Sequence, residues 1–246
     1  PRSTLLASSA AADVYKRQIL FVIPARGGSK RLPKKNIKPL AGKPLISYSI
    51  DVARQLTDDS NICVSTDNDD IISIASDYGY KVPFKRPDEL ASDTTTTNDV
   101  LVHAVNYYKQ LGKNYKYLVL LQVTSPLRRK EDILKALSLI DDTCDMVASV
   151  CKSHAASVMC HENEDGFLTP TLKKDYGRCQ DFKGEYYEFN GSIYAMKVAS
   201  LLEKGMSAFN RKKYVMPDIL STDIDTEEDF IEAEAKLQYL KRTNQL

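Results

Sequence analysis

Short apolar runs alternate with helix-length amphipathic stretches from residue 19 onward, and this alternation constrains the fold more than any other feature. The apolar runs predict strands at residues 19–23, 61–65, 117–122, 146–150 and 192–196. Helical spacing of apolar residues predicts helices at 45–56, 69–78, 98–111 and 131–140, and a last helix at 227–240 capped by Thr226. We therefore predict an α/β fold, a doubly wound and mainly parallel sheet in one domain.

Composition narrows the class of partners. With Lys+Arg at 34 and Asp+Glu at 33, the chain has no broad basic surface for nucleic acid or an anionic membrane. No apolar run approaches the roughly 20 residues of a membrane span. Five cysteines, an odd number without paired spacing, favour a reduced, cytoplasmic setting over a disulfide framework or a zinc site.

Two segments depart from the alternating pattern. Residues 1–18 are small and Ser/Ala-rich, and 8–18 resemble, at all but one position, the translation of a transposon adaptor used in sequencing libraries. We expect this leader to be non-native and the functional domain to span 19–246. Residues 152–190 are polar and Tyr-rich, and we predict a β-rich excursion that forms a dimer contact. An ordinary surface insertion is the alternative.

A cation-rich glycine turn follows the first predicted strand. In open α/β sheets, ligands bind at the carboxyl ends of the strands. Gly27 and Gly28 allow backbone amides to approach an anion, and Arg26, Lys30 and Lys35 supply charge to neutralise a polyphosphate. The spacing fits neither the Walker A loop nor the dinucleotide motif, so a third kind of nucleotide loop is implied. A solvated basic loop and a nucleic-acid patch are the alternatives.

Two aspartates precede the last predicted helix. Asp223 and Asp225 follow a β-like stretch at 214–216, and alternation along an extended chain would point both carboxylates to one side. Mg²⁺ binds through one or two carboxylates plus substrate phosphates. The spacing therefore suggests a magnesium site, whereas acids complementing a helix N-terminus are the alternative.

Five blocks, at residues 23–46, 86–93, 121–128, 190–194 and 223–229, resemble in order those of the cytidylyltransferases that activate nine-carbon acidic sugars, chiefly the CMP-N-acylneuraminate (CMP-sialic acid) synthetases. The resemblance implies a nucleotide-diphospho-sugar transferase-like fold, Mg²⁺ as cofactor and a homodimer. It also implies that CTP and a sialic-type nonulosonic acid react to give a CMP-sugar and pyrophosphate.

The resemblance also assigns residues to roles. It implies catalytic roles for Lys30, Arg26, Asp223 and Asp225, the two aspartates also holding the metal. Nucleotide contacts are implied for Arg26, Gly27, Gly28, Ser29, Lys30, Lys35, Asn36, Arg86 and Thr97. Sugar contacts are implied for Gln122, Thr124, Ser125, Arg178, Gln180, Asn190 and Tyr194. The alternatives are a contact of residues 122–125 with the pyrimidine edge, and a contact of Arg178 and Gln180 with the neighbouring subunit. The chain has Val123 and Ser192 where the family usually has Pro and Ala.

Neighbouring substrates stay open at this point. Synthetases of CMP-3-deoxy-octulosonate typically have Gly at the place of Lys34, whereas pseudaminate enzymes resemble the glycine loop but usually lack the 122–128 block. Legionaminate offers the same carboxylate and anomeric centre as N-acetylneuraminate. A non-catalytic CTP-binding sensor would keep the loop cations but would not need both Asp223 and Asp225.

Overall fold

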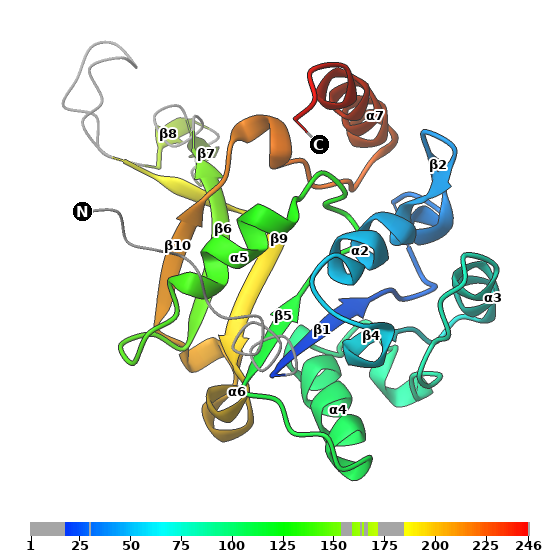
Figure 1. Cartoon of the computed structure of the whole chain (residues 1–246). Coiled ribbons are helices and arrows are strands. Elements are labelled where there is room, and N and C mark those ends of the chain that lie inside the picture. The colour runs from blue at the N-terminus through cyan, green and yellow to red at the C-terminus, as the bar shows by residue number, and fades with distance from the viewer. Residues whose placement is uncertain are drawn as a thin grey trace, which may run out of the picture.

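The computed structural model describes residues 18–29, 31–153, 159–162, 164, 167–171 and 185–245. Its centre is a six-stranded sheet with the order β10-β6-β9-β5-β1-β4 (Figure 1). The strands are β1 (Ile19–Pro24), β4 (Ile62–Ser65), β5 (Tyr117–Leu120), β6 (Met146–Lys152), β9 (Tyr187–Lys197) and β10 (Arg211–Val215). Only β9 runs antiparallel to its neighbours. The predicted mainly parallel α/β sheet is confirmed.

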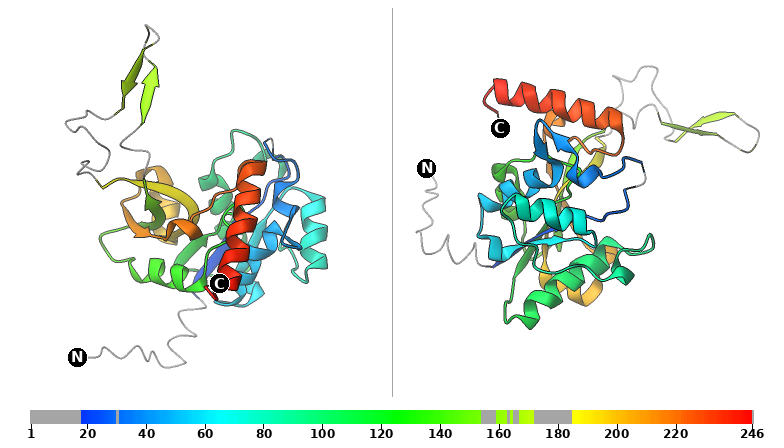
Figure 2. Two further views of the ribbon diagram at one scale, coloured as in Figure 1. Left: turned by 90° about the horizontal axis from the view of Figure 1, so that it is seen from above. Right: turned by 90° about the vertical axis from the view of Figure 1, so that its right-hand side faces the viewer.

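Helices cover both faces of the sheet (Figures 1 and 2). One face packs against α2 (Leu45–Arg54), α3 (Asp69–Asp77), α5 (Lys130–Ser138) and α7 (Glu227–Arg242), and the other against α4 (Thr97–Gln110) and α6 (Val198–Lys204). Strand alternation divides the core accordingly, because Phe21 belongs to the first cluster whereas Leu20 and Val22 belong to the second. The sheet is therefore doubly wound, as predicted.

Short elements fill the connections. A hairpin of β2 (Pro39–Leu40) and β3 (Lys43–Pro44) turns at Ala41 and Gly42, both with positive φ. The 3-10 helices are η1 (Lys35–Ile37), η2 (Asp59–Asn61), η3 (Asp88–Leu90), η5 (Met206–Ala208) and η6 (Asp218–Leu220). The sequence did not predict α6, and it predicted β10 only as a β-like stretch at 214–216. This edge strand begins with three basic residues, so it lacks the apolar run by which the other strands were predicted. The basic residues are Arg211, Lys212 and Lys213, and Tyr214 follows them.

The excursion at residues 152–190 contains two further strands. Strands β7 (Cys160–Glu162) and β8 (Leu168–Pro170) pair antiparallel and project away from the sheet (Figure 2). The last residues of the excursion instead belong to the sheet, because β9 begins at Tyr187, opposite Lys152. Strand β9 is therefore longer than the predicted 192–196.

At the amino-terminal side, the described residues begin at Gln18, directly before the first strand. Of the expected leader, residues 1–17 lie outside the described residues. The carbonyl of Gln18 accepts hydrogen bonds from the amides of Lys116 (2.9 Å) and Tyr117 (3.0 Å), so its backbone already contributes to the start of the sheet. Among the described residues, no helix combines the length and apolar character that a membrane crossing requires.

Candidate active site

A cavity of about 670 Å³ opens at one edge of the sheet. The carboxyl ends of β1, β4, β5 and β10 meet at this edge because these strands are parallel. The antiparallel β9 brings Gly191 to the same edge, since Tyr194 pairs with Leu120 near the end of β5. The cavity wall comes from the glycine loop, the segment 86–97, the turn after β5 and Asp225.

The two glycines of the loop have different surroundings. The amide of Gly27 donates a hydrogen bond to Oδ1 of Asp67 at 3.3 Å, so it is engaged within the protein. A Cβ at Gly27 would lie 2.6 Å from Nδ2 of Asn68, whereas Gly28 has open space. Gly27 is therefore required by close packing of the loop on the turn after β4, whereas a Cβ at Gly28 would meet no described neighbour within 4 Å.

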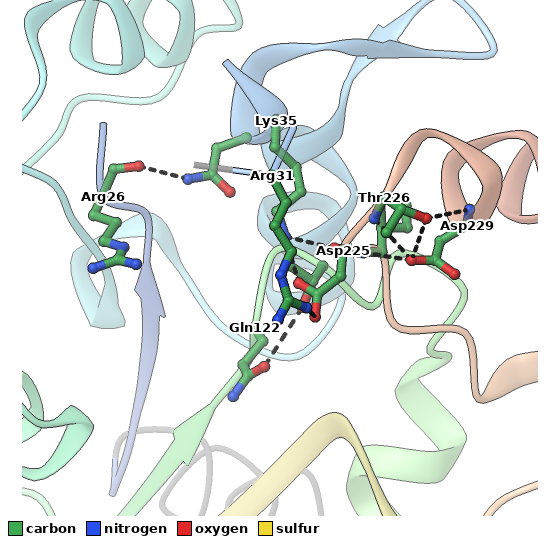
Figure 3. Close-up of polar contacts among 10 residues, drawn as sticks. Arg26, Arg31, Lys35, Gln122, Asp225, Thr226 and Asp229 are labelled. Atoms are coloured by element: carbon green, nitrogen blue, oxygen red, sulfur yellow. Dashed lines mark hydrogen bonds and ion pairs between the residues drawn. The ribbon is translucent and has the colours of Figure 1, made fainter. Parts of the chain in front are cut away.

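The loop is held from behind by a buried amide. Nδ2 of Asn36 donates to the carbonyl of Arg26 at 2.9 Å, which fixes the backbone of the loop (Figure 3). The guanidinium of Arg26 pairs with Asp93 at 3.2 Å, and both groups are exposed at the cavity wall. Ser29 also lines the cavity. Lys30 lies outside the described residues.

The acidic pair has the arrangement that alternation predicted. Asp223 and Asp225 are exposed and the intervening Ile224 is buried, with its amide donating to the carbonyl of Thr124 at 2.8 Å. Lys35 crosses from the glycine loop, and its Nζ donates to the carbonyl of Ile224 (2.6 Å) and to Oδ1 of Asp225 (2.9 Å). One lysine therefore joins the cationic loop to the acidic segment.

Two further groups fix Asp225. Figure 3 shows Arg31 beside its carboxylate, at 3.4 Å, and Asp229 behind its backbone. Asp229 accepts a hydrogen bond from the amide of Asp225 at 2.9 Å and forms a capping box with Thr226 at the start of α7. The predicted cap at Thr226 is confirmed. The start of α7 thus holds Asp225 at the cavity.

The acidic segment suits a cation. Two cationic side chains already gather at the Asp225 carboxylate. A Cβ at Gly191 would lie 3.1 Å from both Oδ2 of Asp223 and Oε1 of Gln122, so these two oxygens approach the same point from different segments. The described residues contain no group of three or more His, Cys, Asp or Glu able to hold a metal. Asp223 and Asp225 therefore fit Mg²⁺ only if substrate phosphates complete its ligands.

Of the polar side chains in the turn after β5, some line the cavity and others are buried in the protein. Gln122 and Thr124 line the cavity. Ser125 is buried and donates to the carbonyl of Asn190 at 3.2 Å. Neither Thr124 nor Ser125 caps α5, because Arg129 occupies the N-cap position. Of these three residues predicted to contact the sugar, only Gln122 and Thr124 face the cavity.

Asn190 supports the cavity wall from inside. Its Oδ1 accepts from Oγ of Ser149 (2.6 Å) and from the amide of Ser192 (3.2 Å), and its Nδ2 donates to Oγ of Ser221 (2.9 Å). The side chain is buried and its polar atoms are engaged within the protein. The structure therefore does not present the Asn190 amide to a sugar.

Three further residues are predicted to contact the sugar, and the structure describes one of them, Tyr194. Tyr194 is partly buried, and burial together with nearby Asp223 raises the pKa of its hydroxyl. It is not among the described residues that line the cavity. Arg178 and Gln180 lie outside the described residues.

Arg86 and Thr97 line the cavity from the segment 86–97. The guanidinium of Arg86 is 4% exposed and pairs with Oδ1 of Asp67 at 3.0 Å, and its Nε has no hydrogen-bond partner among the described residues. The hydroxyl of Thr96 caps α4 in a capping box with Asp99, and both Thr96 and Thr97 line the cavity. Capping and cavity-lining roles thus coexist in this threonine run.

Sequence reasoning missed two residues that support the cavity. Arg128 is 3% exposed and donates to Oγ of Ser49 (3.0 Å), Oγ of Ser192 (3.4 Å) and the carbonyl of Gln122. Burial lowers the pKa of Arg128 and the charge of Asp223 opposes that shift. Asp67 contacts both the loop and Arg86. Its position just after a predicted strand could have indicated it.

The chain resembles curated enzymes over most of its length. It is 35% identical over 218 residues to the CMP-N,N'-diacetyllegionaminic acid synthase of Legionella pneumophila, covering 87% of this chain and 93% of the relative. It is 31% identical to a pseudaminic acid cytidylyltransferase of Campylobacter jejuni, covering 85% and 92%. An N-acylneuraminate cytidylyltransferase of Streptococcus agalactiae is 35% identical and matches over 86% of this chain but 51% of its own length.

Solved structures agree at the level of the fold. A CMP-2-keto-3-deoxy-manno-octonic acid synthetase in complex with CTP superposes with a TM-score of 0.66 at 21% identity, covering 90% of this chain and 99% of the other. A 4-diphosphocytidyl-2C-methyl-D-erythritol synthase from Anaerococcus prevotii gives a TM-score of 0.59 at 17% identity, covering 91% and 99%.

The α/β sheet, its edge cavity and these relatives define the chain as a nucleotidyltransferase. More specifically, the family model described as cytidylyltransferase matches residues 20–245, so the chain belongs to the cytidylyltransferase family.

Proposed function

We propose that this chain joins CTP to a sialic-type nonulosonic acid, giving the CMP-sugar and pyrophosphate. The observation that carries the proposal is the bridge made by Lys35, which joins the cationic glycine loop to Asp225 at one wall of the cavity. Such a bridge places phosphate-neutralising cations beside carboxylates suited to Mg²⁺. The names of the three relatives described above, each a synthase or cytidylyltransferase of a nonulosonic acid, supply the substrate class.

In the proposed reaction the anomeric hydroxyl of the sugar attacks the α-phosphorus of CTP in line, the new P–O bond forms as the bond to pyrophosphate breaks, and the hydroxyl proton is lost. Transfer of this kind depends on positioning and charge neutralisation more than on covalent participation by the protein. Arg26, Lys30 and Lys35 stabilise the charge that grows on the departing pyrophosphate. Asp223 and Asp225 would hold Mg²⁺, which when bound neutralises phosphate charge and lowers the pKa of a nearby hydroxyl.

N-acetylneuraminate or a close relative is the proposed sugar. The turn after β5, which pseudaminate enzymes usually lack in this form, presents Gln122 and Thr124 to the cavity. Legionaminate, pseudaminate and 3-deoxy-octulosonate are the alternatives, and the comparisons favour legionaminate over pseudaminate because the Legionella relative is 35% identical and the pseudaminic acid enzyme 31%.

Pyrophosphate release tests reaction and substrate together. The full chain is assayed with CTP and Mg²⁺ against N-acetylneuraminate, legionaminate, pseudaminate and 3-deoxy-octulosonate, with UTP replacing CTP as the nucleotide control. We expect release with CTP and a nine-carbon acid, and little with UTP. Release with only the eight-carbon acid would reassign the substrate, and release with none of the four would refute the proposed reaction.

We also propose that the protein acts as a homodimer in the cytoplasm. Exposed apolar side chains support the dimer, since Phe189 of β9 is 64% exposed and Val215 of β10 is 39% exposed. The free thiols of Cys63, Cys144 and Cys151 support a reducing compartment. Sedimentation equilibrium tests the dimer: we expect twice the chain mass for wild type and dissociation for Phe189→Ser, whereas a wild-type monomer at micromolar concentration would contradict it.

A further inference from the structure

The turn after β4, residues 66–68, contacts two parts of the cavity wall. On one side the amide of Ala25 donates to the carbonyl of Ser65 at 2.9 Å, and Gly27 packs against Asn68. On the other side the amide of Arg86 donates to the carbonyl of Thr66 at 2.7 Å. The glycine loop and the segment carrying Arg86 are therefore both anchored to one short turn.

Asp67 makes the side-chain connection within this turn. Its Oδ1 accepts hydrogen bonds from the Gly27 amide (3.3 Å) and from Nη2 of Arg86 (3.0 Å). The Asp67 side chain is 21% exposed, and it is not among the described residues that line the cavity. Arg86 is nearly fully buried, and a buried guanidinium that loses its carboxylate is strongly unfavourable. The placement of Arg86 thus depends on the same oxygen that holds the loop.

We propose that Asp67 is a positioning residue that sets the spacing between two walls of the cavity, the segment carrying the buried Arg86 and the glycine loop. The inference rests on the proposed function, which makes CTP the ligand. Because one oxygen holds both walls, its loss weakens the binding of a ligand that contacts both. The whole nucleotide loses more affinity than either half of it, since it must fit both walls at once.

The sign of the effect separates positioning from simple electrostatics. Asp67 is a negative charge beside a site for a polyanion, so removing that charge without any rearrangement would strengthen binding of phosphates. Positioning predicts the opposite, because the loop and Arg86 lose their common support. Asp69 is a matched control: it lies two residues further on and pairs with Lys85, the neighbour of Arg86, at 2.7 Å, but it is 80% exposed and away from the cavity lining.

Isothermal titration calorimetry of the full-length chain tests the proposal, with CTP, cytidine and tripolyphosphate as probes and no sugar present. The variants are Asp67→Ala, which removes both hydrogen bonds, Asp67→Asn, which keeps an acceptor oxygen but not the charge, and the control Asp69→Ala. We expect Asp67→Ala to raise the Kd for CTP about tenfold to hundredfold, and to raise it by a larger factor for CTP than for either half-ligand. Asp67→Asn should give a smaller increase, and Asp69→Ala no weakening.

The outcomes are distinct. Graded weakening from Asp67→Asn to Asp67→Ala, with the control unchanged, supports positioning. Unchanged or tighter CTP binding by either Asp67 variant would overturn it, and so would a half-ligand whose binding is weakened by as large a factor as that of CTP. If Asp67→Ala does not fold, Asp67→Asn carries the same test through the sign of its effect on CTP binding. A wild-type chain that binds no CTP would refute the proposed function itself and the inference with it.

Discussion

Asp225 is an exposed residue with three kinds of contact at the site. Its carboxylate meets Lys35 and Arg31, its amide is held by Asp229, and it stands at the cavity wall. Exposed ion pairs contribute little to stability on their own. These contacts therefore matter mainly because they fix the position of the Asp225 charge at the cavity, and they add little to the free energy of unfolding.

Asp225→Asn should nearly abolish turnover and leave the fold intact, because an amide is a poor replacement for a charged magnesium ligand. Asp223→Asn should behave likewise. The measurement is pyrophosphate release at saturating Mg²⁺, with thermal unfolding as the check on folding. The control is Glu228→Gln, which changes an exposed acid in the first turn of α7. Turnover within a few-fold of wild type in both aspartate variants would make the pair a helix-start acid cluster without a metal role.

The glycine-loop cations should divide their work between binding and the transition state. Charge grows on the leaving pyrophosphate during the reaction, so a cation directed there acts mainly on kcat. Lys30 follows the Gly-Gly turn directly in the sequence, and we expect it to be the cation directed at the leaving group. Lys30→Ala should therefore lower kcat and kcat/KM together, by roughly 10²–10³-fold. Arg26→Ala and Lys35→Ala should raise KM for CTP more. A raised KM with unchanged kcat in Lys30→Ala would contradict this division.

Among the elements, α5 and β10 are joined by a buried carboxylate. Asp132 of α5 accepts from Nε of Arg129 at 2.9 Å and from the hydroxyl of Tyr214, in β10, at 2.7 Å. Burial opposes ionisation, but the hydrogen bonds from Arg129 and Tyr214 outweigh it and lower the pKa of Asp132 below its usual 3.8. The ionised carboxylate therefore ties the edge strand to the helix layer.

Asp132→Asn should destabilise the protein at neutral pH by about 1–3 kcal/mol, the cost of losing hydrogen bonds to a charged group. A carboxyl whose pKa is lowered by folding stabilises the protein above its unfolded pKa, and that contribution is lost as the pH falls through the folded value. The difference in Tm between wild type and variant should therefore be constant above about pH 5 and shrink below about pH 4. A difference that stays the same down to pH 3 would show that the contribution is not linked to ionisation.

At the scale of the whole molecule, β1 is the first strand of the described residues. Its residues are almost fully buried between two helix layers, and the sheet already uses the carbonyl of Gln18. A chain starting with Met followed by Ile19 should therefore match the full chain in Tm and turnover, because the carbonyl of the new Met can accept the same two hydrogen bonds. A Tm lower by several degrees, equivalent to about 1–2 kcal/mol in a chain of this size, would show that the leader contributes to folding.

The sequence by itself determined the α/β class, the strand and helix order near the cavity, the cap at Thr226 and the exposure of Asp223 and Asp225 around buried Ile224. These follow from local periodicity and capping chemistry, which act over a few residues. It also pointed to the cytidylyltransferase family through ordered blocks, and the family model confirms it.

Only the tertiary structure decided which side chains face the cavity. Asn190 and Ser125 lie in the right blocks, yet both are hydrogen-bonded inside the protein, whereas Asp67 and Arg128 support the site without any motif of their own. The antiparallel direction of β9 brings Gly191 beside Asp223 and Gln122. Such contacts join residues far apart in the chain, so they depend on strand order and packing, which no local pattern in the sequence specifies.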